Sequence, residues 1–129
     1  MPDQETRPVI LAVDDTPENL DTVKSILVPD YIVKAAINGM VALKIAGRKP
    51  PDLILLDIMM PGMDGYEVCR QLKIDSGTAH IPVIFLSGDQ DSSSKARGLE
   101  LGAADFVTKP IDPAILKASI RKQLGVCRI

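Results

Sequence analysis

The chain has 129 residues, the length of one domain, and a domain of this size buries about two thirds of the surface that its unfolded chain exposes. Fifteen Lys and Arg against 17 Asp and Glu give a formal net charge of −2, which argues against direct binding of nucleic acid. Two Phe, two Tyr and no Trp also leave few aromatic faces on which bases could stack.

Five short apolar segments recur along the chain. They cover 9–13, 31–36, 53–56, 83–86 and 105–108. Most of these segments are continuous and do not alternate with polar residues. Continuous β-branched and aliphatic runs are typical of strands covered on both faces, as in a parallel sheet. We therefore predict five parallel strands.

Five helices are predicted after these strands. Their approximate ranges are 16–28, 38–47, 66–73, 92–101 and 113–124. Pro17 stands at the first position of the first helix and Pro29 ends it, while Asn38 is placed to cap the second. In the fourth helix, Ala96 and Leu99 are expected to face the core.

Strand and helix alternate five times without a Gly/Ser linker, which predicts a single α/β domain over 1–129, with a core at 9–124 and an N-terminal extension at 1–8. Parallel strands need right-handed crossovers, and a sheet covered on both faces needs helices on each side. The expected architecture is a doubly wound, flavodoxin-like (βα)5 sandwich with strand order 2-1-3-4-5. In this order ligands bind beyond the carboxyl ends of strands 1 and 3.

Polar residues follow four of the strands and are expected to meet at that edge. Asp14 and Asp15 follow the first strand, Asp57 the third, Ser87 the fourth and Lys109 the fifth. Carboxylates about 5 Å apart repel one another by roughly 3 kcal/mol per pair at an effective dielectric near 20, so we expect a compensating cation. An oxygen-only ligand set favours Mg²⁺, or Mn²⁺, over zinc.

This set of residues has a chemical use. A metal ion and Lys109 on one edge form a site for an oxyanion, to which the hydroxyl of Ser87 adds a donor. A carboxylate can attack a phosphoryl group while such cations neutralise the transferring oxygens. Asp57 is therefore the candidate nucleophile, and an aspartyl-phosphate the expected product.

Four fragments stand at the ends of predicted strands. They are VDD at 13–15, LDIMMPGMDG at 56–65, LSG at 86–88 and GAADFVTKP at 102–110. In this order and spacing they resemble the receiver domain of bacterial two-component response regulators, such as the chemotaxis regulators. The resemblance covers about 9–124.

The resemblance implies a role for each matching residue. Asp57 would accept a phosphoryl group from the phosphohistidine of a sensor histidine kinase or a histidine phosphotransfer protein. Asp15 would bind Mg²⁺ directly and Asp14 mainly through water. Asp57 and the backbone carbonyl of Met59 would complete the ligand set. Lys109 would bridge to Asp57 and then to the phosphoryl group.

The resemblance also implies a switch. Ser87 would move to hydrogen-bond the phosphoryl group, and Phe106 would turn inward as it moves. The Lys109-Pro110 peptide would be cis. The signal would leave through the fourth helix, fifth strand and fifth helix, about 91–124, to a downstream effector domain or protein, with a homodimer on phosphorylation as one form of output.

Two alternative functions make different demands on the sequence. A pseudo-receiver that acts through constitutive protein contacts is expected to lack Asp57 or Lys109, and both are present. A Mg²⁺-dependent phosphatase of the haloacid dehalogenase type needs an acid two residues after its nucleophile on the first strand. Thr16 and Pro17 occupy those positions after Asp14 and Asp15. Whether to class the domain as an enzyme is left open, because it would catalyse only its own phosphorylation and dephosphorylation.

The two cysteines, Cys69 and Cys127, form no CxxC pair, which favours a reducing compartment. Segment 1–8 is polar, and no apolar run approaches the roughly 20 residues of a membrane span. We therefore expect a cytoplasmic protein without a membrane or nucleic acid as direct partner.

Overall fold

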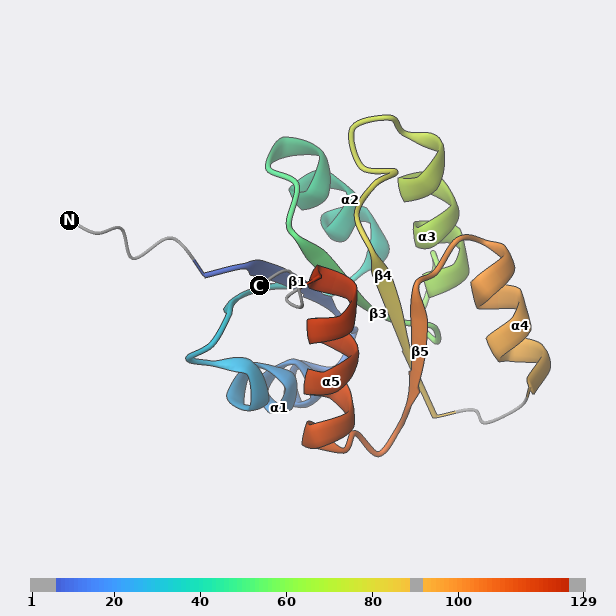
Figure 1. Ribbon diagram of the computed structural model, residues 1–129. Coiled ribbons are helices and arrows are strands. Elements are labelled where there is room, and N and C mark those ends of the chain that lie inside the picture. The colour runs from blue at the N-terminus through green and yellow to red at the C-terminus, as the bar shows by residue number, and fades with distance from the viewer. Residues whose placement is uncertain (1–6, 89–91, 126–129) are drawn as a thin grey trace.

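The computed structural model describes residues 7–88 and 92–125, over which five strands and five helices alternate (Figure 1). The strands are β1 (Val9–Val13), β2 (Ile32–Ala36), β3 (Leu53–Asp57), β4 (Val83–Ser87) and β5 (Asp105–Thr108). The helices are α1 (Pro17–Leu27), α2 (Gly39–Arg48), α3 (Gly65–Ile74), α4 (Ser92–Glu100) and α5 (Pro113–Leu124). Within these residues no helix has the length and apolar character needed to cross a bilayer.

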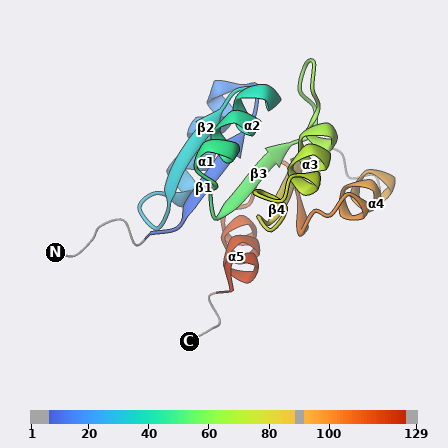
Figure 2. The ribbon, with the colours of Figure 1, turned by 90° about the horizontal axis from the view of Figure 1, so that it is seen from above.

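All neighbouring strands pair in parallel, in the order β2-β1-β3-β4-β5. Seen from above, the first four of these strands follow one another across the sheet (Figure 2). The predicted strand order and fold class are therefore confirmed. Every residue of β3 and β4 is buried, as expected for central strands covered on both faces, whereas the edge strand β2 is mostly half-exposed.

Helices cover both faces of the sheet (Figure 1). One face carries α1 and α5, whose apolar side chains join those of the sheet in one core cluster. The other face carries α2 and α3, with α4 beside β5. The buried helix residues on the first face are Leu20, Val23, Leu27, Leu116 and Ile120, and those on the second include Ala42, Ala46, Val68, Cys69 and Leu72. Cys127 lies outside the described residues.

Local sequence explains where the helices begin. Asn38 caps α2 by accepting from the amide of Val41 at 2.9 Å, as predicted. Asp64 caps α3 in the same way, by accepting from the amide of Glu67 at 3.0 Å, and this cap was not predicted. Pro17 occupies the start of α1, where its missing N–H has no intrahelical role.

The predicted inward face of α4 is wrong. Ala96 is exposed and Leu99 is 45% exposed. The helix approaches the sheet through Gly98, where a Cβ atom would lie 2.7 Å from the ring of Phe85. Because glycine has no side chain, the backbone of α4 can lie directly on this buried ring. The guanidinium of the preceding Arg97 lies 4.2 Å from the ring centre of Tyr66 and so links α4 to α3.

We predict that Gly98→Ala destabilises the protein although alanine is the better helix former. The added methyl group would overlap the fully buried ring of Phe85, and overpacking of this kind costs about 1–3 kcal/mol. Gly47→Ala is the matched control, because a Cβ at Gly47 in α2 meets nothing within 4 Å. In urea unfolding, Gly98→Ala should be less stable than Gly47→Ala by about 1–3 kcal/mol. Equal stability of the two variants would contradict the close packing of α4.

Candidate functional site

Four strands end at one edge of the sheet and carry the predicted site residues there. Asp14 directly follows β1, and Asp57 and Ser87 are the last residues of β3 and β4. The pairing of Ser87 with Thr108 places Lys109 just beyond β5, where its amide donates to the carbonyl of Ser87 at 2.7 Å. The parallel register thus brings together residues that are up to 95 positions apart.

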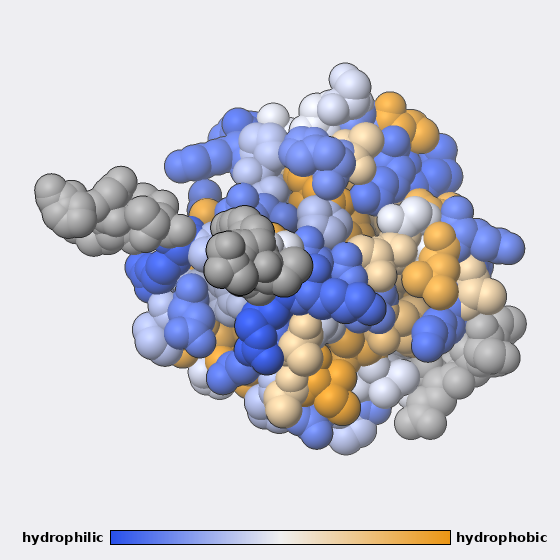
Figure 3. Space-filling model, in the orientation of Figure 1, coloured by the Kyte–Doolittle hydropathy of each residue, from blue (hydrophilic) through white to orange (hydrophobic). Residues whose placement is uncertain are grey.

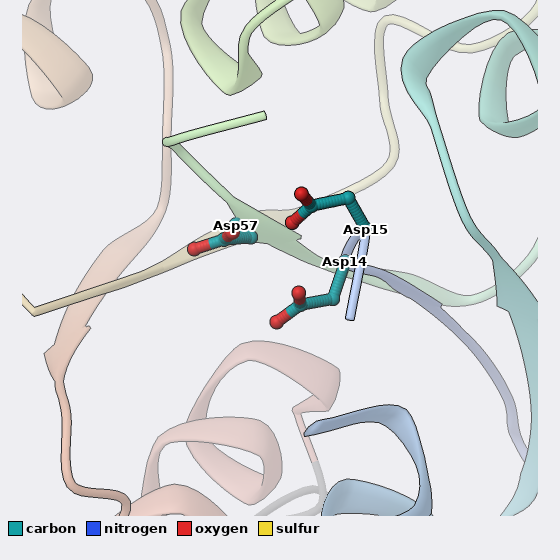
Figure 4. A group of neighbouring side chains, drawn as sticks. All are labelled: Asp14, Asp15 and Asp57. Carbon is teal, nitrogen blue, oxygen red and sulfur yellow. The ribbon is translucent and has the colours of Figure 1, made fainter. Parts of the chain in front are cut away.

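The three carboxylates form an acidic cluster. One oxygen from each of Asp14, Asp15 and Asp57 lies within 4.8 Å of the others. Figure 4 shows the side chains reaching from the ends of β1 and β3 toward a common space. Asp14 and Asp57 are buried, with 4% and 6% exposure, while Asp15 is exposed. Such a set of oxygen donors suits a hard cation such as Mg²⁺ or Mn²⁺.

Lys109 links two members of the cluster. Its Nζ donates to Oδ1 of Asp57 at 3.1 Å and to Oδ2 of Asp14 at 3.3 Å. The ammonium group therefore lies between the ends of β1 and β3 although its own strand is at the sheet edge. The Lys109-Pro110 peptide is cis, as expected, and so is the Val28-Pro29 peptide, which was not predicted.

Burial and neighbouring charges act on these groups in opposite directions. Burial raises the pKa of Asp57, the hydrogen bond from Lys109 lowers it, and the charge of Asp14 raises it again, so that the net shift is upward. Burial acts to lower the pKa of Lys109, but its hydrogen bond with Asp57 and the charges of both aspartates outweigh burial and raise that pKa. Lys109 therefore stays cationic, and a further cation would favour the charged form of Asp57.

The other predicted residues lie around this centre. Ser87 is 2% exposed at the end of β4. Phe106 is half-buried, and its ring centre lies 6.4 Å from that of Phe85. Met59, in the loop after β3, has a side chain that is 76% exposed, and the role of its carbonyl as a metal ligand stays a prediction.

Two supporting residues were missed from the sequence. Asn19 on α1 donates from its side-chain amide to Oδ2 of Asp14 at 3.1 Å. Gly65 begins α3 directly against the end of β3, where a Cβ would collide with the carbonyl of Asp57, and its amide donates to the carbonyl of Ile58 at 2.8 Å. The Asp-Gly pair at 64–65 could have predicted the close approach of α3 to β3, because glycine follows a residue type that caps helices. No sequence pattern predicted the contact of Asn19 with Asp14.

A groove of about 370 Å³ lies beside Lys109 and Asp14. Residues of α1 form one wall, and the segment that joins β5 to α5 forms another. The lining residues are Asp14, Asn19, Thr22, Val23, Leu86, Lys109, Pro110 and Ile111. Apolar side chains from three elements thus lead up to the charged end of the groove.

Comparisons with known proteins agree with this geometry. The family model described as the response regulator receiver domain matches residues 10–121. The response regulator PleD of Caulobacter vibrioides is 48% identical over 113 residues, which cover 87% of this chain and 25% of PleD. A probable cyclic di-GMP phosphodiesterase of Vibrio cholerae is 47% identical over 115 residues, which cover 89% of this chain and 26% of that protein. The chain thus spans about a quarter of the length of both relatives.

A solved structure is also similar. It is the receiver domain of the sensor histidine kinase PA1611 of Pseudomonas aeruginosa, described with a magnesium ion coordinated in its active-site cleft. It superposes with a TM-score of 0.86 at 27% identity, and the match covers 93% of this chain and 99% of the other.

The buried cluster predicts a stability change on removal of one charge. With EDTA present, we expect Asp57→Asn to raise the free energy of unfolding at pH 7. Because the pKa of Asp57 is raised in the folded protein, the folded state loses stability as pH rises from the ordinary value of 3.8 through the raised one. The variant lacks this loss, so its advantage should shrink as pH falls toward 3.8.

Urea unfolding of both proteins at pH 7 and near pH 4 measures the effect. A variant less stable than the wild type at pH 7, or a difference that does not change with pH, would contradict the electrostatic account of the cluster.

Proposed function

The chain belongs to the response regulator receiver domain family, and we propose that it is a phosphorylation-operated switch of a two-component system. Receiver domains of this family partner with histidine kinases and effector domains. The phosphoacceptor in this proposal is Asp57. The observation that carries it is the hydrogen bond from Lys109 to Asp57 within the acidic cluster, since it joins a nucleophile, a cation and a metal-binding donor set at one point.

Asp14, Asp15 and Asp57 would hold Mg²⁺, or Mn²⁺, together with the carbonyl of Met59. When bound, the ion supplies positive charge that neutralises the oxygens of the transferring phosphoryl group. The magnesium ion described in the cleft of the PA1611 receiver domain supports this assignment.

In the proposed reaction, a carboxylate oxygen of Asp57 attacks the phosphorus atom of a phosphohistidine. The O–P bond forms as the P–N bond breaks, and the electron pair of that bond leaves with the imidazole. Lys109 then exchanges its contact with Asp57 for one with a phosphoryl oxygen. The hydroxyl of Ser87 donates to another phosphoryl oxygen.

The groove supports delivery by a protein donor. Its charged end is formed by Asp14 and Lys109, and its remaining walls are mainly apolar. The histidine-bearing element of a kinase or phosphotransfer protein would place apolar side chains in this groove. The phosphohistidine would then face Asp57.

Output would run through α4, β5 and α5, of which the structure describes 92–124. Figure 3 shows apolar residues on the surface between α5 and α4. On α4 itself, Leu99 is 45% exposed. Phe106 of β5 packs against the core beside Phe85 and close to Gly98 of α4. A rearrangement of Phe106 after Ser87 engages the phosphoryl group would change the surface offered to an effector domain, a partner protein or a second copy of the chain.

The two alternatives are less well supported. A pseudo-receiver does not need the ion pair between Lys109 and Asp57, and this chain has it. A phosphatase of the haloacid dehalogenase type needs an acidic residue at the position of Thr16 or Pro17, and neither residue is acidic.

Incubation with acetyl phosphate and Mg²⁺ followed by intact-mass measurement tests the proposal. We expect a single phosphoryl adduct on the wild type, none with EDTA in place of Mg²⁺, and none on Asp57→Asn. Asp64→Asn is a matched control outside the acidic cluster, since Asp64 caps α3, and it should still form the adduct. Absence of the wild-type adduct, or its persistence in Asp57→Asn, would refute the proposed phosphoacceptor.

A further inference from the structure

Asn19 contacts the acidic cluster from the first turn of α1. Its side-chain amide donates to Oδ2 of Asp14 at 3.1 Å, the oxygen that also accepts from Lys109 at 3.3 Å. The other oxygen of Asp14 accepts from the backbone amide of Thr16 at 2.9 Å. Because Asp14 is only 4% exposed, these three donors fix the direction of its carboxylate. Among these three donors, Asn19 is the one that belongs to α1, and it donates through its side chain.

Helix capping does not explain this contact. A polar side chain at this position often reaches back to the amide of the N-cap residue. In α1 the backbone amide of the N-cap residue Thr16 already donates to Asp14. The side-chain amide of Asn19 donates to Asp14 as well, and not to a backbone group of the cap. Asparagine is also a weaker helix former than alanine. The stability of α1 therefore gives no reason for this residue.

We infer that Asn19 is a positioning residue of the metal site. It holds the carboxylate of Asp14 in the orientation in which an oxygen from each of the three aspartates lies within 4.8 Å of the others. The inference rests on the proposed function, because it takes the cluster as the Mg²⁺ site. Donors that orient a ligating carboxylate without touching the metal typically change metal affinity by about 10- to 100-fold when removed.

Mg²⁺ titrations, followed by calorimetry or by backbone amide NMR shifts, test the inference on the intact chain. We expect Asn19→Ala to weaken Mg²⁺ binding about tenfold, the lower end of the range for such residues. Asp14→Asn, which removes a ligand charge, should weaken binding at least as much. Ser25→Ala is the matched control, because Ser25 is an exposed residue of α1 outside the groove lining and its hydroxyl donates to the backbone carbonyl of Thr22 at 2.9 Å. It should bind Mg²⁺ as the wild type does.

Urea unfolding in EDTA separates positioning from folding. Asn19→Ala should still unfold cooperatively, with some loss of stability because the change removes a donor from the buried carboxylate of Asp14. Wild-type Mg²⁺ affinity in Asn19→Ala beside weakened Asp14→Asn would overturn the positioning role and leave the proposed function intact. Equal weakening in Ser25→Ala, or loss of the cooperative unfolding transition in Asn19→Ala, would also overturn it. Wild-type affinity in both Asn19→Ala and Asp14→Asn would contradict the metal site itself.

Discussion

Lys109 donates to two carboxylates at once, to Asp57 at 3.1 Å and to Asp14 at 3.3 Å. With Asp15, these carboxylates form a cluster whose members repel one another, by roughly 3 kcal/mol for a pair about 5 Å apart at an effective dielectric near 20. Burial and, less strongly, the charge of Asp14 keep the pKa of Asp57 raised although Lys109 donates to it. The need for more positive charge makes the site receptive to a divalent cation, and a cation with Lys109 makes it receptive to a phosphoryl group.

The fold makes this arrangement possible because parallel strands end together. The cluster lies where β1 and β3 are neighbours, near the middle of the sheet. Lys109 reaches it from the end of β5, which is an edge strand. Complete burial of β3 and β4 fixes the ends of these strands within the core. The same strands connect the site to α4 and β5, since Ser87 and Phe85 belong to β4 and the ring of Phe85 contacts both Phe106 and the backbone of α4.

Strand positions, strand order and the meeting of Asp14, Asp15, Asp57 and Lys109 could all be predicted from the sequence. The buried strands are continuous apolar runs, and the topology of parallel strands determines which of their ends meet. The charged residues directly follow those runs, so their proximity did not depend on side-chain detail.

What could not be predicted depends on three-dimensional contact. The inward side of α4 is marked by Gly98, which no hydrophobicity pattern identifies, so Ala96 and Leu99 were assigned to the wrong side. Asn19 looks like an ordinary polar residue on a helix, and its bond to Asp14 follows from the path of the turn between β1 and α1.

On the proposed function, this edge of the sheet directs phosphorylation to a single carboxylate. Reduction of the phosphorylated protein with borohydride, followed by peptide mass mapping, tests it most directly, because an acyl phosphate on aspartate is converted to homoserine. We expect homoserine at position 57 and an unmodified aspartate at positions 14 and 15. Homoserine at another aspartate, with Asp57 intact, would contradict the proposed function.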